Sequence, residues 1–377
     1  MERFALSRMK EWKENENRKP LIIRGARQVG KTWIMKTFGQ QYFEKTAYVN
    51  FDNNARMKQV FEGDLDIERL VLAISAETGV SIEAENTLII FDEVQEVPKA
   101  LTSLKYFYEN APQYAIVAAG SLLGVALHQG TSFPVGKVDF LDLYPLNFRE
   151  FLCAMGEKQF VSMLDSCDTQ MVTVFKTKYI ERLREYYFVG GMPEVVKDFS
   201  EKKDYNRVRA IQKNLINYYQ QDFSKHAEIK LVPRLNLVWN SIPMQLAKEN
   251  KKYIYGQVRE GSRAKDFELA IQWLLDCGLI HKVQRIQKPD LPLKAYIDFD
   301  AFKLFLVDIG LLIAMTDLDA KVIIEGNKIF TEFKGSLTEQ YILQQLISDV
   351  GVIPYYYSTQ NSKGEIDFLV QGKTSVI

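Results

Sequence analysis

Residues 25–32 constrain the fold of this chain more than any other stretch of its sequence. They have the pattern G-x-x-x-x-G-K-[ST] and follow the short apolar run at 21–23. This order predicts a strand, a loop bounded by glycines and then a helix, which is the setting in which the pattern has a physical meaning. The glycines allow a tight turn whose backbone N–H groups point inward, toward phosphate oxygens. The helix N-terminus adds unsatisfied donors and a partial positive charge.

The residue types at the end of this loop indicate what each side chain would contact. The Lys31 ammonium is expected to reach the β- and γ-phosphates of a nucleotide, and the Thr32 hydroxyl to hold Mg²⁺. The alternative is a glycine-containing turn that happens to end in Lys-Thr. The residues predicted to bind the nucleotide here are Gly25, Ala26, Arg27, Gln28, Val29, Gly30, Lys31, Thr32 and Trp33.

A second motif consists of the apolar run 88–91 followed by Asp92 and Glu93. Such a run is typical of a strand buried on both faces of a parallel sheet. Asp92 then lies at the carboxyl end of the strand, where open α/β sheets bind their ligands. Its carboxylate is predicted to hold Mg²⁺ through water, and Glu93 to orient and deprotonate an attacking water. The alternative is a helix start at which both acidic residues complement the helix dipole.

The elements predicted around these motifs form a doubly wound parallel sheet. A helix is expected at 2–14, helices at 54–80 and from Pro98 onward, and strands at 46–51, 114–119 and 136–141. The strand at 114–119 is expected to lie between the strands that precede Gly25 and Asp92. Ser121, just after it, would then sit beside the γ-phosphate and position the water. The alternative role for Ser121 is a helix N-cap.

Composition excludes several classes of protein. The 377 residues are 47% hydrophobic, and Lys plus Arg equal Asp plus Glu at 48 each, so no global field indicates nucleic acid or membrane. The longest uncharged apolar run, 115–127, is too short to span a bilayer. Residues 1–13 are charged throughout, which argues against a secretory signal. The few cysteines and histidines are scattered, so neither a disulfide nor a zinc site is expected. A cytoplasmic location is the default prediction.

Together these stretches resemble the bacterial and archaeal AAA-type ATPases in which a P-loop domain is fused to an uncharacterised C-terminal region. The resemblance covers nearly the whole chain. It implies an α/β AAA-type core, a helical lid, a winged-helix module and a small α/β C-terminal module. It implies ATP rather than GTP, because no guanine-specifying Asn-Lys-x-Asp sequence is present. The stretches that carry it are 25–32, 91–95, 119–121, 144–148 and 190–193.

The predicted boundaries follow this resemblance: a P-loop core at 1–145, a lid at 146–225, a winged-helix-like module at 226–318 and a C-terminal module at 319–377. Residues 147–222 show a helical pattern that Gly190 and Gly191 interrupt before Pro193 restarts it. By resemblance, Pro193 would lie near the adenine and sense the nucleotide. A plain turn between helices explains the same residues equally well.

The region 201–288 has 17 Lys and Arg against 9 Asp and Glu, a net charge of about +8. A winged helix with this excess could bind DNA phosphates, although the basic residues are scattered among acidic ones, and a protein-packing role is the alternative. Residues 270–283 predict a helix, a glycine stop and a strand. Residues 301–317 predict another apolar helix.

The last segment resembles the beginning of a restriction-endonuclease-like core. In such a core, an acidic helix residue, here Glu339, and a strand aspartate, here Asp367, meet at a metal. The Glu-x-Lys triplet expected on the strand that follows Asp367 does not occur in residues 368–377. The sequence therefore predicts an incomplete module without nuclease activity.

The function predicted is Mg-dependent hydrolysis of ATP to ADP and phosphate by a nucleotide-dependent conformational switch. Lys31, Glu93 and Ser121 are the predicted catalytic residues, and Thr32 and Asp92 the metal-binding ones. An arginine that offsets developing charge is also expected, with Arg149 and Arg182 as candidates or a neighbouring subunit as its source. The second hypothesis is a nucleotide-stabilised adaptor that binds duplex DNA or a protein partner. A nucleoside kinase is disfavoured, because Asp-Glu at a strand end suits water activation. Assembly into a homo-oligomer is compatible with each of these hypotheses.

Overall fold

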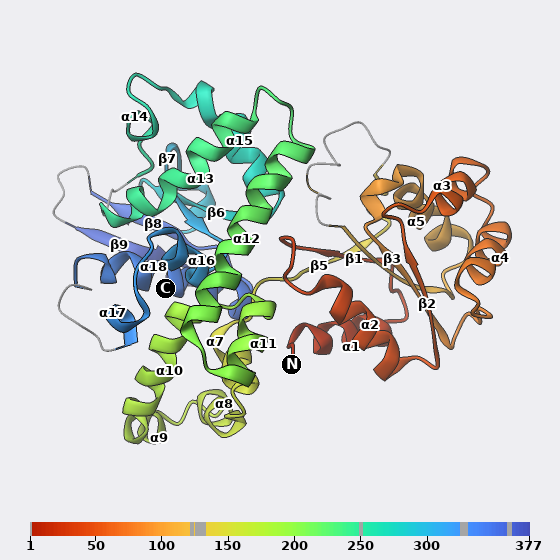
Figure 1. Cartoon of the computed structure of the whole chain (residues 1–377), viewed down its shortest axis with the longest axis horizontal. Coiled ribbons are helices and arrows are strands. Elements are labelled where there is room, and N and C mark those ends of the chain that lie inside the picture. Colours follow the sequence, from red (N-terminus) through yellow and green to blue (C-terminus); the bar gives the residue numbers. More distant parts are fainter. Residues whose placement is uncertain (1, 121–123, 125–132, 249–251, 325–330, 360–363) are drawn as a thin grey trace. The chain divides into compact units, whose positions relative to one another are not determined.

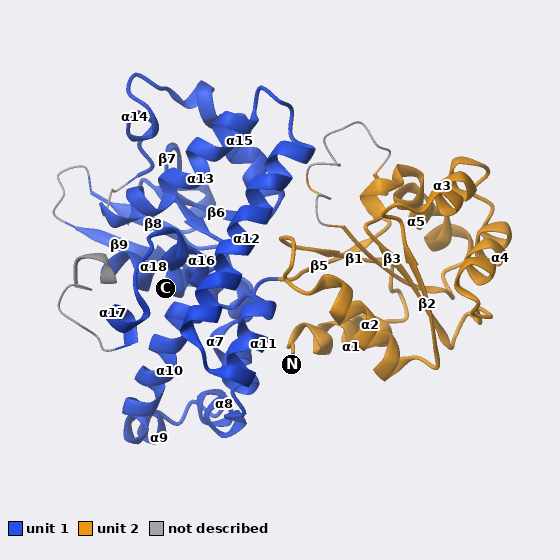
Figure 2. Cartoon of the chain, in the orientation of Figure 1, with its two compact units in different colours: residues 1–2, 144–377 blue, residues 3–143 orange. Residues whose placement is uncertain are grey.

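The chain divides into two compact units, residues 3–143 and residues 1–2 with 144–377 (Figure 2). The structure is a computed structural model that describes residues 2–120, 124, 133–248, 252–324, 331–359 and 364–377 (Figure 1). No helix among these residues is both long enough and apolar enough to cross a bilayer. The finer boundaries expected at 225/226 and 318/319 fall inside the second unit and stay predictions.

The first unit is built on a parallel sheet with the strand order β2-β3-β4-β1-β5. Strand β4 pairs with both β1 and β3, which confirms the central place predicted for it. Every residue of β3 is buried, as expected for a strand covered on both faces. The strands are β1 (Leu21–Arg24), β2 (Lys45–Asn50), β3 (Thr87–Asp92), β4 (Ala115–Ala119) and β5 (Asp139–Asp142).

Helices cover this sheet and confirm the predicted α/β class. Phe51, Phe61 and Phe91 meet edge to face, with ring centroids 5.3–5.7 Å apart, in a core that includes residues of α3, α4 and α5. Helix α2 also packs on the sheet, and α1 packs against α2 through Trp12 and Phe38. The helices are α1 (Ala5–Glu14), α2 (Lys31–Tyr42), α3 (Ala55–Glu62), α4 (Ile67–Thr78) and α5 (Pro98–Asn110).

The second unit begins with a run of helices, as predicted for 147–222. Gly190 ends one of these helices, and Pro193 occupies the first turn of the next. The helices of this run are α7 (Phe148–Ala154), α8 (Lys158–Asp165), α9 (Thr169–Val174), α10 (Lys176–Val189), α11 (Pro193–Lys202) and α12 (Tyr205–His226).

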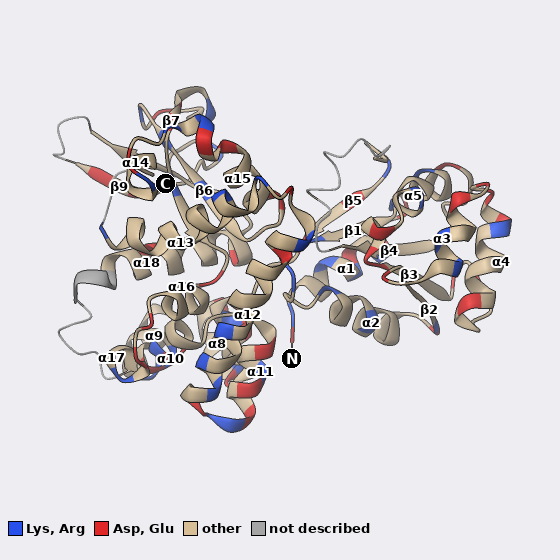
Figure 3. Ribbon diagram, turned by 45° about the horizontal axis from the view of Figure 1, so that its top comes forward, with Lys and Arg blue, Asp and Glu red and all other residues tan. Residues whose placement is uncertain are grey.

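Acidic and basic residues alternate on the surface of α11 and α12 (Figure 3). The Asp198 carboxylate accepts hydrogen bonds from Arg207 at 2.8 Å and from Lys202 at 2.9 Å. Part of the positive charge of 201–288 is therefore compensated locally. Exposed ion pairs of this kind contribute little to stability.

A mixed sheet with the order β7-β6-β8-β9 forms the rest of the second unit together with further helices. Helix α15, the turn at Gly278 and strand β6 confirm the helix–glycine–strand prediction. The boundary predicted at 318/319 falls between strands of this one sheet. Its strands are β6 (Ile280–Ile286), β7 (Ile297–Leu306), β8 (Tyr355–Ser358) and β9 (Glu365–Leu369). The helices are α13 (Val232–Ala247), α14 (Tyr255–Val258), α15 (Ala264–Asp276), α16 (Ile309–Met315), α17 (Ala320–Ile324) and α18 (Thr331–Gln345).

The prediction of one helix over 301–317 is wrong in its first half. Residues 301–306 belong to strand β7, which pairs antiparallel with β6, and only α16 is helical. An apolar run that is buried on both faces has the same sequence signature in a strand and in a buried helix. Pairing with β6 decides between the two, and it is a tertiary contact.

Lys303 lies in this buried strand, and its side chain is 8% exposed. Its ammonium lies 3.0 Å from Glu339 Oε2, 3.1 Å from Glu365 Oε1 and 4.0 Å from Asp367 Oδ1. Burial by itself lowers the pKa of Lys303, but Glu339 and Glu365 outweigh it and raise the pKa above its ordinary value. The two acidic residues predicted to meet at a metal therefore meet at an ammonium. In the described part of the chain, no group of three or more His, Cys, Asp or Glu side chains is arranged to hold a metal ion.

We expect Lys303→Met to destabilise the second unit by about 3 kcal/mol, because the partly buried Glu339 carboxylate, whose side chain is 17% exposed, then loses its counter-charge. The measurement is the shift of the urea unfolding midpoint followed by tryptophan fluorescence. Lys202→Met, at an exposed ion pair, is the matched control and should change stability by less than about 0.5 kcal/mol. Adding Glu339→Gln to Lys303→Met should restore part of the loss. Equal effects of Lys303→Met and Lys202→Met would contradict this account of the cluster.

Candidate functional site

The loop between β1 and α2 has a backbone that favours glycine. Gly25 has a φ of +146°, Gly30 of +95° and Gln28 of +66°. A Cβ atom added to Gly25 would lie 2.1 Å from the backbone oxygen of Leu143. Conformation and space therefore both require glycine at position 25.

The side chains along this loop divide into buried and accessible ones. Ala26 and Val29 are buried in the core, so they can contact a ligand only through their backbone. Gly30 is the N-cap of α2 and has no side chain with which to cap this helix start. Trp33, in the first turn of α2, is 43% exposed. The N-terminus of α2 thus offers backbone donors of the kind that bind phosphate.

The Lys31 side chain folds back over the loop that precedes it. Its Nζ atom donates to Gly25 O at 2.9 Å and to Ala26 O at 2.8 Å. Arg3, which lies just before α1, supports the loop from another direction by donating to Val29 O at 3.0 Å. Arg3 carries no local sequence signal for this role, because no local pattern marks a contact across 26 positions.

Asp92 is the centre of the site and is only 3% exposed. Its Oδ2 atom accepts hydrogen bonds from Thr32 Oγ1 at 2.6 Å and from Tyr48 OH at 2.9 Å. Its Oδ1 atom accepts one from the backbone N–H of Glu93 at 3.1 Å. The structure thus brings together the two residues predicted to hold Mg²⁺, one from the start of α2 and one from the end of β3. The Thr32 oxygen keeps a lone pair for a metal while its proton remains bonded to Asp92.

Tyr48 is the second residue that the sequence analysis did not identify. It lies on β2, directly opposite Ile90 of the neighbouring strand β3. Burial, followed by the charge of Asp92, raises the pKa of the Tyr48 phenol well above its ordinary value, so this group stays a donor. The Lys36 ammonium lies 3.7 Å from the centre of its ring. The sequence signal for Tyr48 was weak: it lies on a predicted strand, and that strand pairs with the one that ends at Asp92.

Glu93 lies directly beyond the end of β3 in a left-handed conformation, with a φ of +51°. Such a φ is uncommon for a residue other than glycine and concentrates at functional sites. The Glu93 carboxylate accepts a hydrogen bond from Gln95 Nε2 at 2.8 Å. Gln95 belongs to the short 3₁₀ helix Val94–Glu96 that follows. The two acidic side chains of the motif therefore have different hydrogen-bond partners.

Two predicted site residues lie outside the described residues of the first unit. Ser121 lies outside the described residues. Pro193 lies in the second unit, where the preceding turn is fixed by Gly191 N–H, which donates to Asp308 Oδ2 at 2.6 Å, and by Gly191 O, which accepts from Leu146 N–H at 2.7 Å. Packing accounts for the glycines of this turn. The nucleotide-sensing role of Pro193 stays a prediction.

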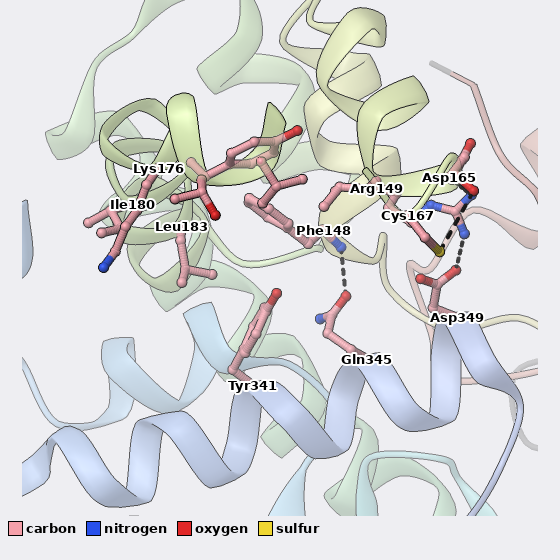
Figure 4. Close-up of a pocket in the computed structure, with 14 residues that line it drawn as sticks. Phe148, Arg149, Asp165, Cys167, Lys176, Ile180, Leu183, Tyr341, Gln345 and Asp349 are labelled. Carbon is pink, nitrogen blue, oxygen red and sulfur yellow. Dashed lines mark hydrogen bonds and ion pairs between the residues drawn. The ribbon is translucent and has the colours of Figure 1, made fainter. Parts of the chain in front are cut away.

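The two candidate arginines are both held by carboxylates of the second unit. Arg182 binds Glu157 and Glu185, each at 2.7 Å. Arg149 binds Asp349 at 3.0 Å and also pairs with Asp165. The Arg149 pairs lie at one end of a largely apolar groove of about 980 Å³ between α7–α10 and α18 (Figure 4). These ion pairs favour a packing role for both arginines.

Comparisons with known proteins agree with this geometry. Residues 17–152 match a family model described as an AAA domain, and residues 180–322 match a domain of unknown function, DUF8612. No curated protein sequence matches the chain. Among solved structures, the Walker-type ATPase PABY2304 of Pyrococcus abyssi is similar, with 15% identity, a TM-score of 0.51 and coverage of 84% of this chain and 95% of that chain. At this identity the similarity shows the fold alone.

Two further solved structures match more remotely. The Aeropyrum pernix Orc1 protein in complex with DNA has 13% identity and a TM-score of 0.31, over 83% of this chain and 91% of that chain. The Thermotoga maritima RuvB Holliday junction branch migration motor has 11% identity and a TM-score of 0.31, over 74% and 87%. Neither score supports an argument about function.

The sheet order, the loop and the Asp92 site define the first unit as a P-loop nucleotide-binding domain. The AAA domain match over residues 17–152 agrees with this class. The winged-helix and restriction-endonuclease-like assignments of the C-terminal region stay predictions, since the match there is to a domain of unknown function.

We expect Gly25→Ala to weaken nucleotide binding at least tenfold, because the added Cβ would contact Leu143 O and the φ of +146° disfavours alanine. Equilibrium titration with a fluorescent ATP analogue measures the effect. Gly256→Ala is the matched control, since its Cβ would meet no atom within 4 Å. Unchanged affinity in Gly25→Ala would show that the loop backbone does not form the binding site.

Proposed function

We propose that this chain binds Mg·ATP at the loop between β1 and α2, hydrolyses it to ADP and phosphate, and acts as a nucleotide-dependent conformational switch. The observation that carries this proposal is the buried Asp92 carboxylate, hydrogen-bonded to Thr32 at 2.6 Å, with Glu93 next to it at the end of β3. A metal-binding pair and a general base beside a phosphate loop suit hydrolysis by water.

Each group has a distinct task in this reaction. Backbone N–H groups of the loop and the Lys31 ammonium hold the β- and γ-phosphates. Thr32 and Asp92 would hold Mg²⁺, which would supply positive charge to offset that on the phosphate oxygens. Glu93 takes a proton from water while the water oxygen bonds to the γ-phosphorus. The bond from the γ-phosphorus to the bridging oxygen breaks, and ADP leaves with the electron pair.

The switch part of the proposal rests on the ligands of Asp92. The same carboxylate would contact the metal's water shell and the two side chains that now donate to it. Loss of the γ-phosphate and metal removes one set of these contacts, and such a change orders or releases nearby segments in other nucleotide switches. Ser121 as γ-phosphate sensor and Pro193 near the adenine remain part of the proposal.

We propose that the charge-offsetting arginine comes from a second copy of the chain or from a partner. The observation that favours this is the pairing of Arg149 and Arg182 with carboxylates inside the second unit. Basal turnover would then be slow. Mass in solution, compared with and without ATP alongside turnover, tests the second copy. Turnover with duplex DNA tests the adaptor alternative, for which the positive charge of 201–288 is the motive.

We expect Glu93→Gln to bind ATP normally but to hydrolyse it about 10²–10⁴-fold more slowly, because the amide cannot accept the water proton. Steady-state phosphate release and ATP-binding titrations separate the two effects. Glu96→Gln, in the exposed part of the same turn, is the control and should match the wild type. Wild-type turnover in Glu93→Gln would remove Glu93 from its role.

Tyr48→Phe should raise the Mg²⁺ concentration needed for half-maximal turnover by about tenfold, since outer hydrogen bonds orient metal-binding carboxylates. Binding of ATP in EDTA should stay unchanged, because Tyr48 is not proposed to touch the nucleotide. The measurement is a Mg²⁺ titration of phosphate release. An unshifted titration would assign the bond between Tyr48 and Asp92 to folding alone.

A further inference from the structure

Only one of the two polar atoms of the Gln95 side-chain amide has a hydrogen-bond partner among the described residues. Its Nε2 atom donates to Glu93 Oε2 at 2.8 Å. Its Oε1 atom is buried and has no hydrogen-bond partner among the residues that the structure describes. A buried acceptor without a donor is costly, and such groups in native proteins often mark a catalytic role or a missing water.

The orientation of this amide follows from its neighbour. Turning it over would place the Gln95 carbonyl against the Glu93 carboxylate, where two acceptors repel each other. The hydrogen bond from Nε2 to Glu93 therefore fixes the amide so that its Oε1 atom points away from the Glu93 oxygen that Nε2 contacts. The left-handed turn at Glu93 and the 3₁₀ helix that follows bring the two side chains together.

The donor that fits this oxygen is a water molecule. Water has two hydrogens, and Glu93 and Gln95 offer two acceptors on adjacent side chains. A water bonded to both acceptors has its orientation fixed, and its lone pair faces away from them. Orientation of the attacking water is one of the main contributions that a protein makes to phosphoryl transfer.

We propose that Gln95 is a water-positioning residue: its Nε2 atom holds the Glu93 carboxylate, and its Oε1 atom accepts a hydrogen bond from the attacking water. This inference rests on the proposed ATP hydrolysis and adds a residue to it. No bond of Gln95 forms or breaks in the reaction. The water proton passes to Glu93, and Gln95 fixes the direction from which the water oxygen approaches the γ-phosphorus.

The test variant is Gln95→Met, which keeps the length of the side chain and removes both polar atoms. We expect kcat to fall by about tenfold to a hundredfold, with KM for ATP and ATP affinity unchanged. The melting temperature should stay equal or rise, because the unsatisfied buried oxygen is gone. A merely structural residue would lower the melting temperature together with kcat. Glu96→Met, in the same turn, is the control and should keep wild-type turnover.

A double variant tests whether Gln95 acts through the same water as Glu93. In Glu93→Gln, the further change Gln95→Met should alter kcat by less than about twofold, because residues that act as a unit are not additive. Multiplying effects would overturn the inference. Turnover of Gln95→Met within about twofold of the wild type would also overturn it. A loss seen only in turnover that a partner stimulates would overturn it as well, because Oε1 would then bind a cation of that partner.

The outcomes also separate this inference from the proposed function. If wild-type protein hydrolyses ATP and Glu93→Gln does not, the proposed function holds, and Gln95→Met alone decides the role of Gln95. If the wild type binds no ATP, or Glu93→Gln is as fast as the wild type, both fall together.

Discussion

The hydrogen bonds to the Asp92 carboxylate are the interaction on which the first unit depends. A buried carboxylate is costly unless donors surround it. Here the donors come from three places: Thr32 at the start of α2, Tyr48 on β2, and the backbone N–H of Glu93. These bonds tie the phosphate loop to the edge of the sheet. They also hold the carboxylate in the position at which a metal ion would need it.

The strand order explains how two motifs 60 residues apart meet at this point. Strand β4 lies between β1 and β3, so the carboxyl ends of all three strands lie along one edge. The loop after β1 and the Asp-Glu pair at the end of β3 therefore lie together at the carboxyl ends of the strands, where α/β folds bind ligands. Gly25 packs against Leu143 so closely that no side chain fits, and this contact fixes the base of the loop.

The second unit shows the same principle applied to a different pair of elements. Lys303 carries a charge into a buried strand, and Glu339 of α18 and Glu365 of β9 surround it. Asp308, fully buried, accepts hydrogen bonds from Gly191 and Leu311 and so joins the Gly-Gly turn to the start of α16. In both places a buried charge links segments far apart in the sequence. Removing one partner would leave the other uncompensated.

Local sequence was sufficient for the elements of the phosphate site. The glycines with their left-handed φ, the apolar run before Asp92 and the helix after Lys31 follow from backbone sterics and burial, which act over a few residues. The place of β4 within the parallel sheet was predicted from the doubly wound topology and not from these short-range rules. Local rules did not distinguish a buried strand from a buried helix at 301–306, where every residue except Lys303 is apolar, because short apolar runs occur in both.

Only the tertiary structure decided which additional residues join the site. Arg3 and Tyr48 lie outside the predicted motifs, and Gln95, at the end of the stretch 91–95, was given no role of its own. Each matters through a partner: Val29 O, the Asp92 carboxylate and the Glu93 carboxylate. The same holds for Lys303, whose place in an apolar strand looks unfavourable until Glu339 and Glu365 are beside it. Sequence patterns record backbone preference and burial, whereas a hydrogen bond between distant side chains exists only once the sheet has brought its strands into register.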